Sequence, residues 1–279
     1  MLPSRLLSFV ALAWLFFANQ LSAATPIPFQ FRDGLIWVKV RPSGTGEPLN
    51  FLLDSGAGSS VLDLAAARRF GVRLGERQSV QGVDGRSAAF QVKDFAARAA
   101  GIALPSSMLA VDLSEPSRSC HQRIDGLLGV DFFRERIVQI DFGSQTIRLL
   151  QRCEVNDAGC EILPIATRND AMCVSASVDG NRPEWLRLDT GCNTALEWAV
   201  TGDKAKKLGV ITIGLHPSPV QEFLTDVLLG TKRVSAVKTG VHPRQMFAGE
   251  SGLIGNGLLS RFVVTIDATN RRCLLAEQH

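Results

Sequence analysis

The chain has 279 residues, of which 46% are hydrophobic and 20% are charged, and its formal net charge is +3. This composition is typical of a globular protein with a buried core and excludes an intrinsically disordered chain. The net charge is small and no basic stripe carries interleaved aromatic residues, so we expect no nucleic-acid partner. The length allows one large or two medium domains.

The N-terminal segment has the pattern of an export signal. Arg5 precedes the apolar run LLSFVALAWLFFA, and the small residues Ser22–Ala24 follow that run. A basic start, a short apolar stretch and small residues are typical of a secretory signal peptide. The sequence therefore predicts a signal peptide over residues 1–24, cleavage near Ala23 or Ala24, and a periplasmic or extracellular protein. An uncleaved anchor is the alternative, and it would be the chain's one association with a membrane.

The rest of the chain contains two copies of one β-rich pattern. In each copy a β-type run, a turn and a short apolar strand lead to Asp-Ser/Thr-Gly, at residues 54–56 and again at 189–191. Each copy continues with two aliphatic residues and a glycine, at 127–129 and 253–255, and then with a strand that ends in Ile-Asp. Short strands bounded by turns predict an all-β protein. We expect two lobes, residues 25–152 and 153–279, related by a pseudo-twofold axis.

Few helices are expected. The segment Asp63–Gly71 begins with an aspartate cap, carries its arginines late and ends in glycine, which predicts a short helix. Asp203–Gly209 is its weaker counterpart in the second copy. Asp141 and Asp267 follow isoleucine in equivalent places, and both are expected to start a turn.

A hairpin is predicted over Val80–Val92, with Asp84 and Gly85 at its tip. It is either a flap over a binding site, with Phe90 as a cover, or an ordinary surface hairpin.

The six cysteines are compatible with disulfide bonds in an exported protein, but their spacing does not predict a zinc site. Cys153 and Cys160 are close enough in sequence to close a short loop. The sequence leaves the pairing open, and buried free thiols are the other interpretation.

The two repeated aspartates, Asp54 and Asp189, are the candidate catalytic residues. If the two copies pack about a twofold axis, their turns meet there, and two carboxyl groups a few ångströms apart share one proton. The charged carboxylate then polarises a water molecule while the protonated partner donates to a carbonyl oxygen, which is acid–base hydrolysis. The alternative is that both aspartates only cap strand ends.

The neighbouring residues suit a catalytic pair. Gly56 and Gly191 allow a tight turn that brings backbone N–H groups to the carboxylates. Ser55 and Thr190 supply hydroxyls that can bond across the axis and hold the two turns together. The apolar strands before the aspartates would anchor both turns in the core.

These motifs resemble those of the aspartic proteases of the pepsin and retropepsin clan. The resemblance covers most of the chain after residue 24. It rests on the two Asp-Ser/Thr-Gly turns and on the aliphatic-aliphatic-glycine motifs of the ψ-loops, which are Leu127-Leu128-Gly129 and Leu253-Ile254-Gly255. The resemblance implies a two-lobed all-β fold with the active site between the lobes, in a tandem, retropepsin-like arrangement.

The resemblance also implies a function. It identifies the chain as an exported aspartic endopeptidase that acts on peptides or unfolded proteins with Asp54 and Asp189, without a metal or an organic cofactor. We expect a monomer, because a complete pair in one chain removes the need to dimerise. Two alternatives are a catalytically weak or inactive peptide-binding module of the same fold and a structural envelope protein.

The chain departs from the family pattern in two respects. Pepsin-like enzymes usually carry a flap tyrosine, and this chain has no tyrosine. Ala57 and Cys192 stand where a serine often follows the glycine of the motif. Each carboxylate is therefore expected to lack one hydrogen bond, which argues against a strongly acidic optimum. Cys192 is expected to be either a disulfide partner or a small buried residue.

Overall fold

The computed structural model describes residues 25–44, 47–82, 85–200 and 221–278. The predicted signal peptide and the predicted helix Asp203–Gly209 lie outside these residues. Within them, no helix is both long enough and apolar enough to cross a membrane.

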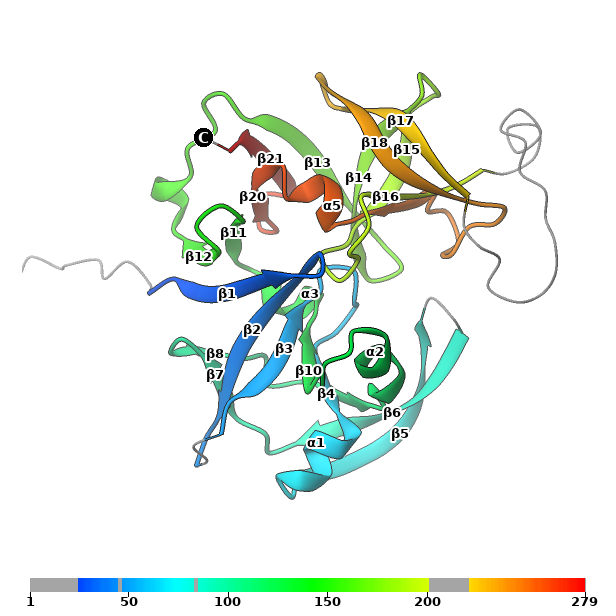
Figure 1. Ribbon diagram of the computed structural model, residues 1–279. Helices are drawn as coiled ribbons and strands as arrows, with labels where there is room; N and C mark the ends of the chain where they lie inside the picture. Colours follow the sequence, from blue (N-terminus) through cyan, green and yellow to red (C-terminus); the bar gives the residue numbers. More distant parts are fainter. Residues whose placement is uncertain (1–24, 45–46, 83–84, 201–220, 279) are drawn as a thin grey trace, which may run out of the picture.

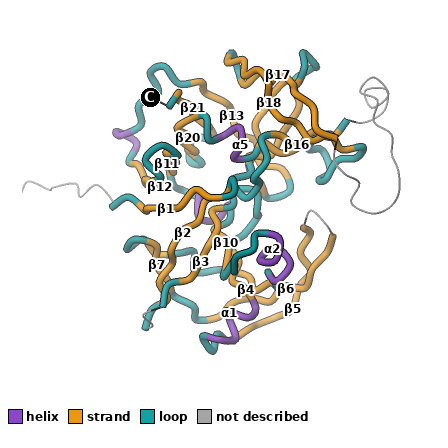
Figure 2. The backbone as a smooth tube through the Cα atoms, viewed as in Figure 1, coloured by secondary structure: helices purple, strands orange, loops and turns teal. Residues whose placement is uncertain are grey.

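The described chain is built mainly of strands, arranged as two lobes that share one sheet (Figures 1 and 2). The elements up to α3, apart from part of β1, form the N-terminal lobe: β1 (Ile27–Arg32), β2 (Leu35–Pro42), β3 (Leu49–Leu53), β4 (Val61–Asp63), α1 (Leu64–Arg69), β5 (Arg73–Gly82), β6 (Gly85–Lys93), β7 (Ala97–Ala99), β8 (Ile102–Ala103), β9 (Leu109–Val111), α2 (Ser114–Ser119), β10 (Gly126–Leu128) and α3 (Val130–Phe133).

The C-terminal lobe repeats the order of the first strands of the N-terminal lobe. Between the lobes run β11 (Ile137–Asp141), β12 (Thr146–Leu150) and η1 (Arg152–Glu154). The remaining elements are β13 (Glu161–Arg168), β14 (Ala171–Val178), β15 (Glu184–Leu188), β16 (Leu196–Ala199), β17 (Gln221–Leu229), β18 (Lys232–His242), β19 (Gly252–Ile254), α5 (Asn256–Leu259), β20 (Phe262–Asp267) and β21 (Arg272–Glu277).

Each lobe contains the same three-strand arrangement. In the N-terminal lobe β10 lies between β3, to which it is parallel, and β4, to which it is antiparallel. In the C-terminal lobe β19 lies in the same way between β15 and β16. Because the middle strand comes much later in the chain than its neighbours, this is the ψ-shaped loop that the repeated aliphatic-aliphatic-glycine motif predicts.

One antiparallel sheet of six strands connects the lobes, in the order β1, β12, β11, β20, β21, β13. Its centre is the pair β11 and β20, the equivalent strands of the two copies, in which Gln139 lies opposite Thr265. The turns expected at Asp141 and Asp267 follow these strands. Their carboxylates accept backbone N–H bonds from Gly143 and Asn270.

Most of the buried apolar residues form one large cluster that contains residues of both lobes. It includes Leu53 and Leu188, which are almost fully buried and directly precede Asp54 and Asp189. Both aspartate turns are therefore attached to strands fixed in the core, as the apolar runs before them predict.

The predicted helix after Asp63 is confirmed as α1. The Asp63 carboxylate accepts hydrogen bonds from the backbone N–H groups of Ala65 and Ala66, so it is the N-cap.

Two sequence-based interpretations need correction. The possible Cys153–Cys160 disulfide is absent, and the six cysteines, all of them described, are free. The Cys160 thiol instead donates to the Asn156 carbonyl at 3.5 Å. The hairpin predicted over Val80–Val92 is the paired strands β5 and β6, but Phe90 is partly buried against the main apolar cluster and serves as core.

Candidate active site

The two repeated aspartates start equivalent turns at the junction of the lobes. Asp54 directly follows β3, and its backbone N–H donates to the Leu128 carbonyl at 2.9 Å. Asp189 directly follows β15, and its N–H donates to the Ile254 carbonyl at the same distance. The last residue of each ψ-loop strand thus fixes the backbone of the adjacent aspartate.

Ser55 and Thr190 connect the two turns. The Thr190 hydroxyl accepts from the Ser55 backbone N–H at 2.9 Å, and the Ser55 hydroxyl accepts from the Thr190 N–H at 3.1 Å. Each hydroxyl also donates to the carbonyl that precedes the opposite aspartate, at Leu188 and Leu53. All four bonds are buried and cross between the copies, as the repeat predicts.

The turn glycines bring the carboxyl groups together. A Cβ atom on Gly56 would lie 2.4 Å from Cγ of Asp189, and one on Gly191 would lie 2.5 Å from Cγ of Asp54. Each glycine therefore packs its backbone against the opposite carboxyl group, at a separation that excludes any side chain. The two carboxyl groups are therefore close enough for the charge of Asp54 to raise the pKa of Asp189.

The two carboxyl groups have different surroundings. Oδ1 of Asp54 accepts from the backbone N–H groups of Gly56 and Ala57, both at 3.0 Å, whereas Oδ1 of Asp189 accepts from Gly191 at 2.9 Å. Burial raises the pKa of Asp54, and its two N–H donors offset part of that rise. Burial, and then the charge of Asp54, raise the pKa of Asp189 to about 8. Asp189 is thus the better place for a shared proton.

The ψ-loop residues named from the sequence support these turns. A Cβ atom on Gly129 would lie 2.3 Å from the backbone of Ser59, and one on Gly255 would lie 2.4 Å from the Thr194 carbonyl, so both positions require glycine. Leu127 and Leu253 pair within the ψ arrangement, opposite Leu52 and Arg187.

Comparisons with known proteins agree with this geometry. An aspartyl protease family model matches residues 38–132, which contain the first aspartate turn and the first ψ-loop. Over 92% of the chain, the fold superposes on 98% of the crystal structure of an aspartic proteinase from Irpex lacteus, with a TM-score of 0.60 and 13% sequence identity. The chain has the fold of a pepsin/retropepsin-like aspartic protease. No curated protein matches it significantly.

The sequence interpretation missed one residue beside the two carboxyl groups, Arg187. It lies two residues before Asp189 on β15 and donates from Nη1 to the Gly56 carbonyl of the opposite turn, at 2.8 Å. A charged residue inside the apolar run of a strand, on the same face as the following aspartate, was the available signal. Its partner Glu250 is 63 residues away, so no local pattern reveals the pair.

Cys192 is half-buried beside the second aspartate, and its thiol lies 3.1 Å from the Thr194 hydroxyl. Burial, and then the negative charge of Asp189, raise the pKa of this thiol to about 11. The thiol therefore stays protonated at neutral pH and is a poor nucleophile. Of the two expectations for Cys192, the small buried residue fits better than the disulfide partner.

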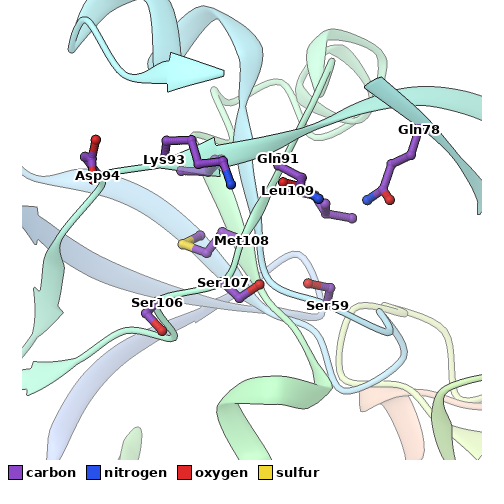
Figure 3. Close-up of a pocket in the computed structure, with 10 residues that line it drawn as sticks. Ser59, Gln78, Gln91, Lys93, Asp94, Ser106, Ser107, Met108 and Leu109 are labelled. Atoms are coloured by element: carbon purple, nitrogen blue, oxygen red, sulfur yellow. The ribbon is translucent and has the colours of Figure 1, made fainter. Parts of the chain in front are cut away.

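A polar hollow of about 560 Å³ lies in the N-terminal lobe, beneath the β5–β6 hairpin (Figure 3). Gln78 and Gln91 line it from the hairpin, and Ser59 lines it from the turn that begins at Asp54. Its other wall is the segment Ser106–Leu109, which leads into β9. The hollow therefore adjoins the first aspartate turn. Its polar lining consists of amides, hydroxyls and the charged side chains of Lys93 and Asp94.

The described residues contain no cluster of three or more histidine, cysteine, aspartate or glutamate side chains arranged to hold a metal ion.

Proposed function

We propose that the chain is an aspartic endopeptidase in which Asp54 and Asp189 hydrolyse peptide bonds together. The observation that carries the proposal is the close approach of two carboxyl groups across two turns that are hydrogen-bonded to each other. Aspartates that only capped the ends of strands would need no such contact between the lobes. A purely structural role therefore leaves the cross-bonds and the close approach of the glycines unexplained.

The unequal surroundings assign the two roles. Asp54, with two backbone N–H donors, is the carboxylate that accepts a proton from water. Asp189, with its raised pKa, is the carboxylic acid that donates to the substrate carbonyl oxygen. This assignment is one microstate of a pair that titrates together.

The reaction then needs no covalent intermediate. The water oxygen bonds to the carbonyl carbon, one water proton passes to Asp54, and the Asp189 proton passes to the carbonyl oxygen. When the resulting diol collapses, the C–N bond breaks and the nitrogen leaves with the proton held by Asp54. The proton balance is restored when the diol returns one proton to Asp189.

The substrate class follows from the site's place in the fold. We propose that an extended peptide or unfolded segment lies between the lobes, because only an extended backbone can present one peptide bond to both turns. The complete carboxyl pair in one chain supports a monomer. No step requires a metal or an organic cofactor.

Export is proposed from the N-terminal sequence alone. Mass spectrometry of the protein purified after expression with its first 24 residues would test it. A new N-terminus near Thr25 is expected, and an intact Met1 in a membrane fraction would support the anchor instead.

The decisive experiment compares wild type, Asp54→Asn and Asp189→Asn on an unfolded protein substrate across acidic to mildly alkaline pH. We expect cleavage by wild type and none by either variant. Folded wild type that binds peptides in fluorescence titrations but cleaves none would overturn the proposal in favour of the binding module.

A further inference from the structure

A buried cation lies directly behind the two aspartate turns. The Arg187 side chain is 4% exposed, and its Nη1 donates to the Gly56 carbonyl of the opposite lobe at 2.8 Å. Gly56 is the residue whose N–H donates to Asp54 and whose backbone packs against Asp189. Arg187 thus contacts a residue that adjoins both carboxyl groups.

The cation is held in a fixed orientation. Nε and Nη2 of Arg187 donate to the two carboxylate oxygens of Glu250, at 2.7 and 2.8 Å, and Glu250 is 1% exposed. Asn169 donates to the same carboxylate at 2.7 Å. The ring of Phe247 lies 3.5 Å from the guanidinium carbon. With two bonds to Glu250 and one to Gly56, the guanidinium has little freedom to turn.

The fold does not require this arginine. The equivalent residue of the N-terminal lobe, two positions before Asp54, is Leu52, which is 5% exposed and packs in a small apolar cluster. One copy of the repeat therefore fills the position with a hydrocarbon side chain. Burying a charged pair there is costly, so a role in the site explains it better than stability does.

We propose that Arg187 is a positioning residue for the reaction: it fixes the Asp54 turn through the Gly56 carbonyl and places a positive charge that favours the singly ionised carboxyl pair. This inference rests on the proposed function and deepens it. Glu250 holds the guanidinium in place and weakens its field at the carboxyl groups, since its charge lies on the far side of the arginine.

Other titratable groups adjoin this arrangement and must be considered. They come from β13, β14, the turn between these strands, the loop before β19 and the Asp189 turn, and they are Arg168, Cys173, Asp170, Glu250 and Cys192. The raised pKa values of about 12 for Cys173 and about 11 for Cys192 leave both thiols neutral through neutral pH. Arg187 also lowers the pKa values of both aspartates against the effect of burial.

Three variants separate charge from scaffolding. Arg187→Gln removes the cation, so both ionisations of the carboxyl pair should move to higher pH by roughly one unit, the size of effect that a neighbouring arginine has on an aspartate. Glu250→Gln removes the opposing anion, so the ionisations should move to lower pH. Arg187→Lys keeps the charge but loses the paired hydrogen bonds of the guanidinium to Glu250. Its kcat should therefore fall, while its pH profile should stay that of wild type.

The test measures the carboxyl pair directly. The ¹³C carboxyl signals of Asp54 and Asp189 are followed against pH in aspartate-labelled protein and assigned with Asp54→Asn and Asp189→Asn, and peptide cleavage is measured in the same samples. The titration does not depend on turnover, so an inactive wild type would refute the proposed function while the inference is still tested. Arg272→Gln is the control, because Arg272 pairs with buried Asp267 in the sheet between the lobes.

Opposite shifts for Arg187→Gln and Glu250→Gln, with none for Arg272→Gln, are the expected result. General destabilisation cannot produce shifts of opposite sign. Unchanged titration in both variants, or shifts in the same direction, would overturn the inference. If Arg187→Gln fails to fold, the acid shift of Glu250→Gln and the unchanged profile of Arg187→Lys must still be observed for the inference to stand.

Discussion

Ser55 and Thr190 hold the two lobes together at the carboxyl pair by a reciprocal exchange of hydrogen bonds. Each hydroxyl accepts the other residue's backbone N–H, at 2.9 and 3.1 Å, and donates to the carbonyl before the opposite aspartate. Both side chains are almost completely buried. Because each hydroxyl acts as donor and acceptor at once, the removal of one leaves two partners in the opposite lobe unsatisfied.

Thr190→Val should therefore lower stability and activity together. The change leaves the Ser55 N–H and the Leu53 carbonyl buried without partners, at a cost of roughly 1 to 3 kcal/mol for each group. Urea unfolding and peptide cleavage measure the two effects. Thr239→Val is the control, since the buried Thr239 hydroxyl bonds to Thr225 away from the site. It should lose stability but keep its kcat while folded, and an equal loss of kcat in both variants would contradict the prediction.

Gly56→Ala should abolish cleavage without unfolding the lobes. The new methyl group would lie 2.4 Å from Cγ of Asp189, so that carboxyl group must move away from its partner. A displacement of this size costs a catalytic site far more than it costs a fold. Cleavage assays and circular dichroism spectra test the two halves of this expectation.

Gly143→Ala is the matched control for Gly56→Ala. Its nearest atom, a carboxylate oxygen of Asp141, would lie 3.4 Å from the new Cβ atom, which is ordinary contact in a turn remote from the site. Wild-type activity is expected. If Gly56→Ala also retained wild-type activity, the close approach of the two turns could not be essential.

Much of this site can be predicted from the sequence because its central motif occurs in both copies of the repeat. Asp54 and Asp189 are each followed by a hydroxyl residue and glycine, and the repeat alone predicts that the turns meet and exchange hydroxyl bonds. Local chemistry also predicts the Asp63 cap of α1, since capping involves residues within one turn. Both inferences depend on patterns a few residues long.

The features that sequence reasoning missed depend on distant partners or on a break in the repeat. Arg187 meets Glu250 and Gly56 only after the lobes assemble, and its counterpart Leu52 gives no warning of it. Phe90 was a candidate cover for the site, but pairing of β6 with β9 places it opposite Ala110 and against the core. Alternation along a strand does not reveal which neighbour a side chain will pack on.

The hollow beneath the β5–β6 hairpin should influence which peptides are cut. Ser107 is exposed and lines it, so Ser107→Phe fills the space without disturbing the core. We expect a higher KM for peptides with long polar side chains on one side of the cleaved bond and little change in kcat, because the carboxyl pair is untouched. A set of peptides that differ at one position, compared by KM and kcat, tests this.

Ser43→Phe is the control for the hollow. Ser43 is also exposed and lines a second hollow of about 440 Å³, beside Arg41 and Arg98 at the β2–β7 edge. It should cleave every peptide as wild type does. If the two variants behave alike, the hollow near Ser59 takes no part in substrate selection.

Stability should fall as pH rises through the range in which Asp189 keeps its proton. Its pKa is raised from 3.8 to about 8 in the folded protein, so above pH 4 the unfolded chain releases a proton that the folded chain retains. The folded state then binds more protons, and the free energy of unfolding decreases with pH by at most about 1.4 kcal/mol per unit until about pH 8. The stabilising contribution is complete below pH 4 and is lost by pH 8.

Asp189→Asn should flatten this slope and make the variant more stable than wild type above pH 8, although it is inactive. The amide cannot ionise beside Asp54, so no buried pair of charges forms at alkaline pH.

Asp267→Asn should instead be less stable than wild type at neutral pH and differ little from it in acid. Burial alone would raise the pKa of Asp267, but bonds from Asn270 and Arg272 lower it, so its carboxylate stabilises the fold at neutral pH and not in acid. The urea unfolding midpoints of both variants and wild type at pH 5, 7 and 9 test these expectations. If the stability of Asp189→Asn changed with pH in parallel with that of wild type, Asp189 would hold no proton in the folded protein.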